Sequence, residues 1–499
     1  MTSLLTGKIC TVIRECAVDD FEAEILKSRE DSDVMEFRLD YLDSIEVTLG
    51  LMRRWISMAG VPVIATLRRK PYGGLFIGSK VEQLEILSNI QGAGFAFLDI
   101  EIETLEVLLP TELERIKRGT WRLIASYHNF KKTPSNLGPI FHRILAVEPD
   151  VVKIATLATS FSDNFRLIQM IDQAKDRGVA IIPVAMGELG AYSRLVASSC
   201  GALLTYAASR TGKEAAPGQL TAQAMHYVYR LNAINPNTVF YGVVGYPIGH
   251  SLSPHIHNYA FEQAGLDCRY LPLPTSNLED FAPHLEHFAG LSVTLPHKVA
   301  ILNYVNSKHE SVKQSGATNT LVKGDRGFCA YNTDLEGIRY ALRDCLSGQL
   351  SKVVLLGAGG AARSAALVLK EVGCQVTVLA RDQNKAQQLA NDFDLESDSL
   401  DQIEEYSGDL LINATPVGMA PNSHEHLVSE TILNYGTVFD MVYNPLETLL
   451  IQKARAKASV VSGLDMFVGQ AARQFQLWTG LEAPIQGMRE VALQQLSPG

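Results

Sequence analysis

The sequence predicts an α/β protein: a (β/α)8 barrel over residues 1–230, followed by two further α/β domains, the second of them a Rossmann-type nucleotide-binding domain. Three observations carry this prediction. Eight short β-favouring runs recur in the first half at intervals of about 22–33 residues. Across residues 215–254 the spacing changes, through a turn or short linker at residues 235–237. A glycine-rich turn at residues 357–362 then joins a β-branched run to an apolar helix.

The eight runs alternate with helix-like segments. They begin at Lys8, Val34, Pro62, Phe95, Arg122, Val151, Ala180 and Ala202. The intervening stretches, such as residues 81–94 and 165–178, show helical apolar spacing and end in glycine. Eight such units in about 230 residues fit a (β/α)8 barrel. A doubly wound open sheet is the structural alternative.

Composition excludes several classes of protein. A chain of 499 residues suggests several domains, and its net charge of −10 argues against nucleic-acid binding, so any anion needs a local basic cluster. The seven cysteines are scattered without metal-ligand spacing, so we expect neither a disulfide framework nor a bound metal. The absence of a signal or transit pattern and of a membrane-length apolar run predicts a cytoplasmic protein. The oligomeric state stays open.

Polar side chains mark the strands of the predicted barrel, whose active sites lie at the carboxyl ends of strands. Glu36 and Arg38 alternate along the second strand and therefore share one face. Arg68 ends the third strand, and Asp99 and Glu101 lie on the fourth. Structural ion pairs are the alternative interpretation of Glu36 with Arg38 and of the fourth-strand carboxylates.

A lysine in the middle of an apolar strand is harder to explain structurally. Lys153 lies between Val152 and Ile154, and burial favours its free amine, which is the form that attacks a ketone. His128, at the end of the neighbouring strand, could take a proton beside the resulting iminium. Arg194 follows the seventh strand. A lone histidine is usually structural, but beside this lysine a catalytic role is favoured.

These residues belong to ordered motifs. The motifs are E-F-R (36–38), T-L-R (66–68), D-I-E-I (99–102), L-I-A-S-Y-H-N (123–129), V-K-I-A (152–155), M-G-E-L-G-A-Y-S-R (186–194) and A-P-G-Q (216–219). Across the whole first half the chain resembles type I 3-dehydroquinate dehydratases. The resemblance implies a Schiff base between Lys153 and the substrate ketone, with His128 removing the C2 proton. It also implies that five residues hold the substrate's hydroxyls and carboxylate: Glu36, Arg38, Arg68, Arg194 and Gln219.

Two positions depart from that family. Tyr72 stands before Gly73 and Gly74, where the family usually has an acidic residue that orients the histidine. Ala215 replaces a serine of the substrate lid, so we expect one lid hydrogen bond to be missing. Neither change removes the chemistry.

Polar residues in the second half suggest a second substrate site. Ser251 and Ser253 lie at a turn before a helix that Pro254 can start, and hydroxyls with helix N–H groups make a carboxylate site. Helix capping is the alternative role of these serines.

A lysine and an aspartate in the same half form a candidate acid–base pair. A short strand, L-S-V-T-L-P-H-K, ends in Lys298, and Asn319 and Asp334 follow further strand-like runs. A surface Lys298–Asp334 ion pair is the alternative.

The glycine-rich turn indicates a dinucleotide site. Its residues Gly357, Gly359, Gly360 and Ala361 open a helix after the run K-V-V-L-L, which permits close approach of a pyrophosphate. The next strand ends at Arg381 and Asp382, with Lys385 one turn further on. Cations there suit the 2′-phosphate of NADP(H), whereas an acid suits a free ribose hydroxyl. Solvated surface charges are the alternative.

Together these pieces resemble shikimate dehydrogenases. The motifs are G-Y-P-I-G-H-S-L-S-P (245–254), S-V-T-L-P-H-K (292–298), T-N-T (318–320), Y-N-T-D (331–334), G-A-G-G-A-A (357–362), N-A-T-P-V-G-M (413–419), D-M-V-Y-N-P-L-E-T (440–448) and G-L-D-M-F-V-G-Q (463–470). The resemblance implies that Ser251 and Ser253 hold the substrate carboxylate and that Lys298 and Asp334 form the acid–base pair. The implied ring-hydroxyl contacts are Thr294, Asn319, Asp334 and Gln470, and the implied nicotinamide side is Thr415, Met419, Tyr443, Gly463 and Met466. Ala380, Arg381 and Asp382 replace the family's common Asn-Arg-Thr.

The two resemblances imply consecutive reactions, from 3-dehydroquinate to 3-dehydroshikimate and then, with NADPH, to shikimate. The predicted domains are residues 1–230, residues 238–345 with helices of 464–499, and residues 346–463. A quinate-directed dehydrogenase with the same folds is one alternative, and a ligand sensor without chemistry is another. Retention of four reactive residues argues against the sensor: His128, Lys153, Lys298 and Asp334.

Overall fold

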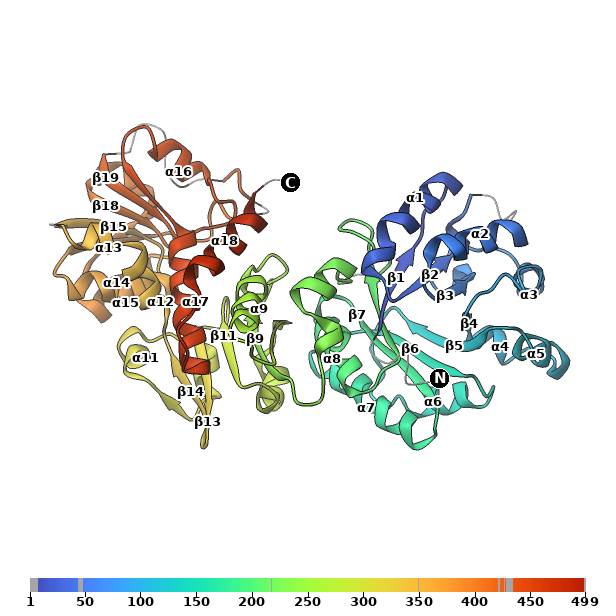
Figure 1. Cartoon of the computed structure of the whole chain (residues 1–499). Helices are drawn as coiled ribbons and strands as arrows, with labels where there is room; N and C mark the ends of the chain where they lie inside the picture. Colours follow the sequence, from blue (N-terminus) through green and yellow to red (C-terminus); the bar gives the residue numbers. More distant parts are fainter. Residues whose placement is uncertain are drawn as a thin grey trace. The chain divides into compact units, whose positions relative to one another are not determined.

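The computed structural model describes residues 8–43, 48–216, 218–348, 350–420, 422–425, 427 and 434–497. Contacts divide the chain into two compact units, residues 1–238 with 271–284 and residues 239–270 with 285–499. In the described part of the chain, one sheet of eight strands and two sheets of six strands carry the fold (Figure 1).

The first sheet is a parallel barrel with the order β7-β6-β5-β4-β3-β2-β1-β8. Its strands are β1 Lys8–Ile13, β2 Val34–Arg38, β3 Val63–Thr66, β4 Phe97–Glu101, β5 Arg122–Asn129, β6 Val151–Leu157, β7 Ala180–Met186 and β8 Leu204–Ala208. The backbone N–H of Leu203, just before β8, donates to the Ile181 carbonyl on β7 (2.9 Å), which nearly closes the circle. The predicted barrel is confirmed, and the open-sheet alternative is wrong.

Helices surround this barrel (Figure 1). They are α1 Val18–Ser28, α2 Leu49–Ala59, α3 Lys80–Asn89, α4 Ile102–Leu105, α5 Pro110–Lys117, α6 Gly138–Leu145, α7 Ser162–Asp176 and α8 Ala191–Cys200. Local sequence sets their ends: a capping box between Ser79 and Glu82 starts α3, and Gly60, at φ 66°, ends α2. The apolar faces of these helices pack on the outside of the sheet.

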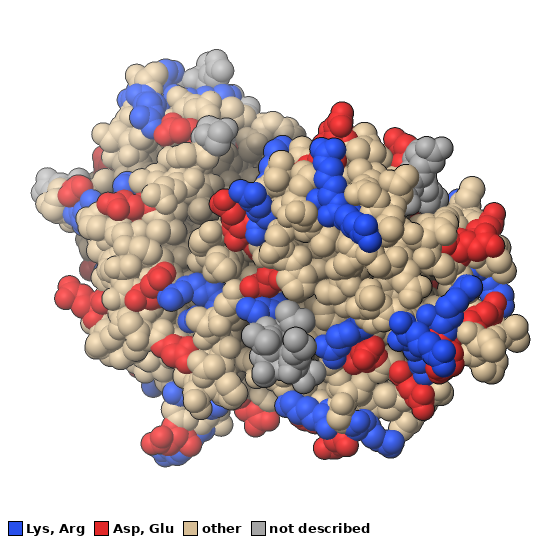
Figure 2. All heavy atoms as spheres, turned by 45° about the vertical axis from the view of Figure 1, so that its right-hand side comes forward, with Lys and Arg blue, Asp and Glu red and all other residues tan. Residues whose placement is uncertain are grey.

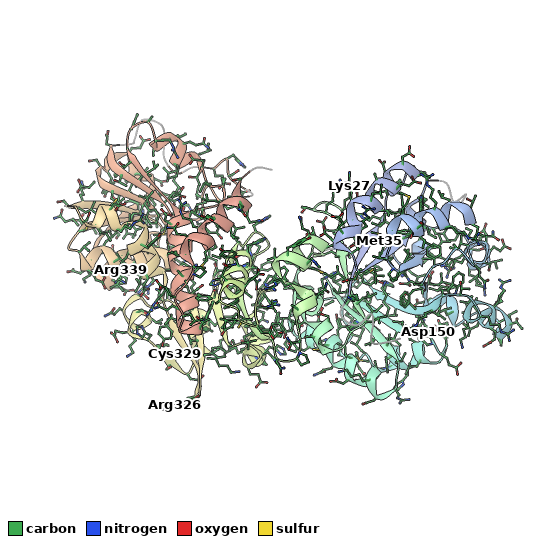
Figure 3. The ribbon with its side chains drawn as sticks, viewed as in Figure 1. Lys27, Met35, Asp150, Arg326, Cys329 and Arg339 are labelled. Atoms are coloured by element: carbon green, nitrogen blue, oxygen red, sulfur yellow. The ribbon has the colours of Figure 1, made fainter. Side chains whose placement is uncertain are left out.

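The second sheet is mixed, with the order β10-β9-β11-β13-β14-β12. Its strands are β9 Val239–Gly245, β10 Cys268–Pro274, β11 Gly290–Val293, β12 Ser307–Lys308, β13 Thr320–Gly324 and β14 Gly327–Tyr331. The strands β13 and β14 form an antiparallel hairpin with Arg326 at its tip (Figure 3). The helices of this region are α9 Ser253–Gln263, α10 Leu278–Phe281, α11 Glu310–Ser315, α12 Asp334–Ala341 and α13 Arg343–Leu346.

The third sheet is wholly parallel, with the order β17-β16-β15-β18-β19-β20. Its strands are β15 Lys352–Leu356, β16 Gln375–Ala380, β17 Glu396–Ser399, β18 Gly408–Asn413, β19 Tyr435–Asp440 and β20 Ser459–Ser462. Counted from β15, this order is the 3-2-1-4-5-6 arrangement of Rossmann domains, as predicted.

Helices α14 Gly360–Glu371, α15 Gln383–Phe393 and α16 Leu449–Ala454 belong to the third sheet. The last two helices, α17 Gly463–Thr479 and α18 Ile485–Leu496, pack against α12 and α9 respectively (Figure 1).

Charged side chains of both signs are interspersed over the face drawn in Figure 2. Within the described ranges, none of the helices combines the length and the apolar character needed to cross a bilayer.

Candidate active sites

Strand alternation builds a polar layer inside the barrel. An apolar layer contains Val34, Phe97, Ile124, Val151 and Leu204, one from each of five strands. Two residues further along the same strands stand Glu36, Asp99, Ser126, Lys153 and Tyr206, all buried. Side chains two residues apart on a strand point to the same face. The barrel interior therefore has one apolar layer and, next to it, one polar layer.

Lys153 is the centre of this polar layer. Its Nζ donates to Asp99 Oδ2 (2.8 Å) and to the Tyr206 hydroxyl (2.8 Å), and Glu36 Oε1 lies 3.6 Å away. Two carboxylates thus lie beside the Lys153 amine, which its apolar sequence neighbours did not indicate.

Asp99 is held ionised by its neighbours. It accepts from Arg68 Nη2 (2.7 Å) and from Ser126 Oγ (2.6 Å), in addition to Lys153. Burial alone would raise the pKa of Asp99, but Arg68 and Lys153 outweigh burial and hold it below its ordinary value. Arg68 lies in the loop after β3, which ends at Thr66, so its predicted place at the strand end was slightly wrong.

His128 lies near the end of β5, beside Lys153's strand β6. Burial, with the nearby charges of Arg68 and Lys153, holds the pKa of His128 well below its ordinary value. The imidazole is therefore neutral at neutral pH, which is the form that a general base requires. Its Nδ1 makes no hydrogen bond in the described structure, in line with the missing acid at Tyr72, and Phe130 stacks on the ring with centroids 6.0 Å apart.

The structural alternative, an ion pair between Glu36 and Arg38, does not form among the described residues. Arg38 binds Asp40 through two hydrogen bonds (Nε to Oδ1, 2.9 Å; Nη2 to Oδ2, 2.8 Å). Glu36 Oε1 instead accepts from Thr66 Oγ1 (2.8 Å) on β3. Likewise Asp99 and Glu101 are not partners; Glu101 accepts from Arg69 Nε (3.2 Å). The partners of these residues thus differ from the pairs that alternation along one strand suggests.

Two further predicted residues follow the carboxyl ends of β7 and β8, one in a helix and one in a loop. Arg194, in the first turn of α8, is buried, which lowers its pKa to about 10. Gln219 Oε1 accepts from the Ala215 N–H (2.7 Å), and the loop passes so close to Gly187 that a Cβ at Gly218 would lie 2.3 Å from its carbonyl oxygen. Ala215 packs against the apolar cluster inside the barrel.

In the second half, Lys298 and Asp334 meet. Lys298 Nζ donates to Asp334 Oδ2 (2.5 Å), and Asn319 Nδ2 donates to Asp334 Oδ1 (2.7 Å) and to Gln470 Oε1 (3.2 Å). The carboxylate is 5 % exposed, so the pair is no surface ion pair. Contrary to the sequence prediction, Lys298 lies in the turn after β11, which ends at Val293, and Asn319 precedes β13 rather than following a strand.

The predicted carboxylate turn lies at the start of α9. Ser253 begins the helix and is buried, and its N–H donates to Ser251 Oγ (3.3 Å). Tyr443, predicted for the nicotinamide side, also reaches the backbone of Leu252 within this turn; burial raises its pKa to about 12. Thr294 lies against Gly245 at the end of β9, where its N–H donates to the Val244 carbonyl (2.9 Å).

The glycine-rich turn has the shape that a dinucleotide needs. Gly357 has φ 107°, and a Cβ there would lie 3.0 Å from Thr415 Cγ2. A Cβ on Gly360, the first residue of α14, would lie 3.2 Å from Lys298 Cδ. Backbone N–H groups at an open helix start fit the phosphate groups of a dinucleotide, and Lys298 lies close to this helix start. Gly359 is the exposed N-cap of this helix, and Ala361 lies in its first turn.

Of the two cations predicted to bind the 2′-phosphate, Lys385 already has an ion-pair partner. Asp382 is the N-cap of α15: its Oδ1 accepts from the Lys385 N–H (3.2 Å), and its Oδ2 lies 3.3 Å from Lys385 Nζ. Arg381 is exposed just after β16. Asp382 thus caps its own helix and forms an ion pair with Lys385, one of the two predicted cations.

The remaining residues predicted for the nicotinamide side come from one loop and one helix. Thr415 donates to Asn413 Oδ1 (2.7 Å), and Met419 is exposed in the same loop. Gly463 and Met466 begin α17, where a Cβ on Gly463 would lie 2.3 Å from the Met441 carbonyl oxygen. Within the described residues, no group of three or more His, Cys, Asp or Glu side chains is placed to hold a metal ion.

Sequence reasoning missed several polar partners. These are Ser126 and Tyr206 in the barrel, and Tyr270, Asp440 and Gln474 in the second half. The signal for Ser126 and Tyr206 was present, since both keep strand alternation with an apolar residue two positions earlier.

Comparison with known proteins follows the same division of the chain. Residues 9–236 match the type I 3-dehydroquinase family, and residues 243–321 match the shikimate dehydrogenase substrate binding domain. Residues 341–431 match the shikimate/quinate 5-dehydrogenase family, and residues 463–493 match the shikimate 5′-dehydrogenase C-terminal domain.

Individual relatives agree. A shikimate dehydrogenase (NADP(+)) of Methanothermobacter thermautotrophicus is 40% identical over 50% of this chain and 94% of its own. A shikimate dehydrogenase crystallised with NADP+ superposes with a TM-score of 0.50 at 32% identity, covering 53% of this chain and 98% of that one. The chloroplastic bifunctional 3-dehydroquinate dehydratase/shikimate dehydrogenase of Arabidopsis thaliana is 34% identical over 95% of this chain and 82% of the relative. The chain belongs to the family of bifunctional 3-dehydroquinate dehydratase/shikimate dehydrogenases.

Proposed function

We propose that this chain dehydrates 3-dehydroquinate through a Schiff base on Lys153 and reduces the product, 3-dehydroshikimate, to shikimate with NADPH. The observation that carries the proposal is a lysine hydrogen-bonded to a buried carboxylate in each half of one chain: Lys153 with Asp99, and Lys298 with Asp334. Mass spectrometry of the products from 3-dehydroquinate, with and without NADPH, tests it. Without NADPH we expect 3-dehydroshikimate alone, and with NADPH we expect shikimate.

The dehydratase half supports covalent catalysis. The Lys153 amine adds to the ketone carbon, and loss of water leaves an iminium that makes the C2 proton acidic. Neutral His128 takes this proton, and the C1 hydroxyl then leaves as water with a proton returned by the imidazolium. A second water hydrolyses the iminium and restores the lysine. Arg38, Arg68, Arg194, Glu36 and Gln219 are proposed to hold the substrate around it.

The dehydrogenase half supports proton transfer beside a nicotinamide. Lys298 holds the proton that the C3 oxygen takes up, and Asp334 fixes the ammonium while accepting from Asn319. Ser251 and Ser253 are proposed to bind the substrate carboxylate, with Thr294, Asn319, Asp334 and Gln470 on the ring hydroxyls.

NADPH, when bound, supplies the hydride. The residues proposed to hold it are Gly357, Gly359, Gly360, Ala361, Arg381, Lys385, Thr415, Met419, Tyr443, Gly463 and Met466.

Shikimate is expected to be preferred over quinate, which distinguishes this proposal from a quinate-directed dehydrogenase. The dehydratase half would supply 3-dehydroshikimate, and quinate carries an additional C1 hydroxyl that the pocket would have to accommodate and hydrogen-bond. Steady-state oxidation of both compounds with NADP should give a kcat/KM at least about tenfold higher for shikimate. Equal or higher kcat/KM for quinate would favour the rival activity.

Arg381→Ala is expected to raise the KM for NADP by about tenfold or more and to change that for NAD little, because only NADP carries the 2′-phosphate. Asp382→Asn should sharpen the preference for NADP. The asparagine side chain still caps α15, whereas Lys385 loses its ion-pair partner and becomes available to the phosphate. Steady-state kinetics with both coenzymes measure these effects. Unmodified protein that uses NADP and NAD equally, with no change in Arg381→Ala, would contradict the assignment.

A further inference from the structure

We propose that Asp440 is a positioning residue of the dehydrogenase: it sets the orientation of the Asn413 amide and, through that amide, holds Thr415 at the nicotinamide side. This inference rests on the function proposed above. It concerns a buried carboxylate to which the proposed chemistry assigns no role.

Asp440 ends β19 and is fully buried. Its Oδ1 accepts from Asn413 Nδ2 (2.9 Å) and from the Val442 N–H (3.1 Å), and its Oδ2 accepts from Thr448 Oγ1 (2.6 Å). All three donors are neutral. Burial of a carboxylate with no cation beside it lowers the stability of the fold. The function of Asp440 therefore lies in the hydrogen bonds that it accepts.

Asp440 and the Val417 carbonyl together decide which way the Asn413 amide faces, since both accept from Asn413 Nδ2 (2.9 and 3.3 Å). An ionised carboxylate only accepts, so Asn413 has to turn its NH2 group towards Asp440 and its oxygen away. That oxygen accepts from the Thr415 N–H (3.0 Å) and from Thr415 Oγ1 (2.7 Å). Thr415 Oγ1 in turn accepts from the Val417 N–H (3.2 Å). The order Asp440, Asn413, Thr415 is therefore a one-way relay of hydrogen bonds.

The second carboxylate oxygen of Asp440, Oδ2, holds the loop after β19 through Thr448. Thr448 donates to Asp440 and accepts from the Ile451 N–H (3.2 Å), which caps α16. The Ala420 N–H donates to the Asn444 carbonyl (2.9 Å), so loops 413–419 and 440–448 are also joined beyond the relay. One carboxylate thus ties together the ends of β18 and β19, which are paired at Asn413 and Asp440.

The protonation state of Asp440 provides a second test, through the pH dependence of the melting temperature. Burial raises the pKa of Asp440 to about 6, against the opposing effect of its three donors. Because this pKa lies above the ordinary value, Asp440 stabilises the fold most when protonated, and that contribution is lost as pH rises through about 6. At pH 8 the charge therefore weakens the fold, and Asp440→Asn should melt at a higher temperature than the unmodified protein. The difference should shrink below pH 5.

A double-mutant cycle on the full-length chain tests the relay. NADPH affinity is measured by fluorescence titration, and kcat by shikimate oxidation, for Asp440→Leu, Thr415→Val and the double variant. Each single change should weaken NADPH binding by about tenfold, and the double change should weaken it little further, because both break the same relay. Asp440→Asn should retain near-normal affinity, since its side-chain oxygen can still accept from Asn413. Thr448→Val removes only the hydrogen bonds of Thr448 with Asp440 Oδ2 and with the Ile451 N–H. This variant should have a lower melting temperature and an unchanged affinity for NADPH.

The outcomes separate the alternatives. Additive losses in the double variant, or unchanged NADPH affinity in a folded Asp440→Leu protein, would overturn the relay. If Asp440→Leu does not fold, Asn413→Ala replaces it in the same cycle, with the same expectation. Unmodified protein that fails to bind NADPH would instead refute the proposed function, whatever the variants do.

Discussion

Lys153→Ala is expected to abolish dehydration of 3-dehydroquinate, with kcat lowered by about 10⁴-fold or more, because the variant lacks the amine proposed to form the imine. Oxidation of shikimate by the same protein should be unchanged, since the proposed acid–base pair of the second half is intact. Borohydride added with 3-dehydroquinate or 3-dehydroshikimate should fix the mass of the ligand on the peptide that contains Lys153. Coupled absorbance assays of both activities measure the two rates on one sample.

Lys27→Ala is the matched control for this variant. Lys27 is exposed on α1 (Figure 3), so its loss should leave dehydration and labelling intact. The imine mechanism would be wrong if Lys153→Ala kept normal dehydration or if the label appeared on another peptide.

Lys298→Ala is expected to lower kcat for shikimate oxidation by about 10²–10⁴-fold, the usual contribution of a positioned general acid or base. The variant leaves Asp334 without its cation, although Asn319 still donates to that carboxylate. Dehydration should be unaffected, which makes this variant the reverse of Lys153→Ala. Initial rates of NADPH formation over a range of shikimate concentrations separate the loss in kcat from any change in KM.

Lys308→Ala serves as the control here, because Lys308 is an exposed lysine on β12 in the same half of the chain. A well-folded Lys298→Ala protein that lost both activities would show that the two sites depend on each other, contrary to expectation.

The strands of the barrel could be located from the sequence because their signals are local. Five of the eight strands begin at the predicted residue, at Lys8, Val34, Arg122, Val151 and Ala180. The other three begin one or two residues later. Alternation of apolar residues and glycines at helix ends are local signals. They can therefore be recognised without knowledge of the tertiary structure. The glycine-rich turn before α14 was predictable for the same reason.

Positions in loops were less predictable. Lys298 was expected at the end of a strand and Asn319 after one, yet the first lies in a turn beyond β11 and the second precedes β13. Their meeting with Asp334 depends on the packing of two loops against the first turn of α12, which no periodicity encodes. The missed residues Tyr206 and Asp440 show the same limit, because their partners come from other strands: Lys153 on β6 for Tyr206, and Asn413 on β18 for Asp440.

The sequence by itself determined the fold class and the order of the two halves, and it singled out Lys153 and Lys298 as candidates, because these inferences depend on short-range patterns and motifs. Only the tertiary structure decided which charge neutralises which. Lys153 meets Asp99 across 54 positions of sequence, Arg38 meets Asp40 rather than Glu36, and Lys385 meets Asp382 at a helix cap. Electrostatic energy depends on distances in space and on burial, summed over side chains from several strands, so it exists only once the chain has folded.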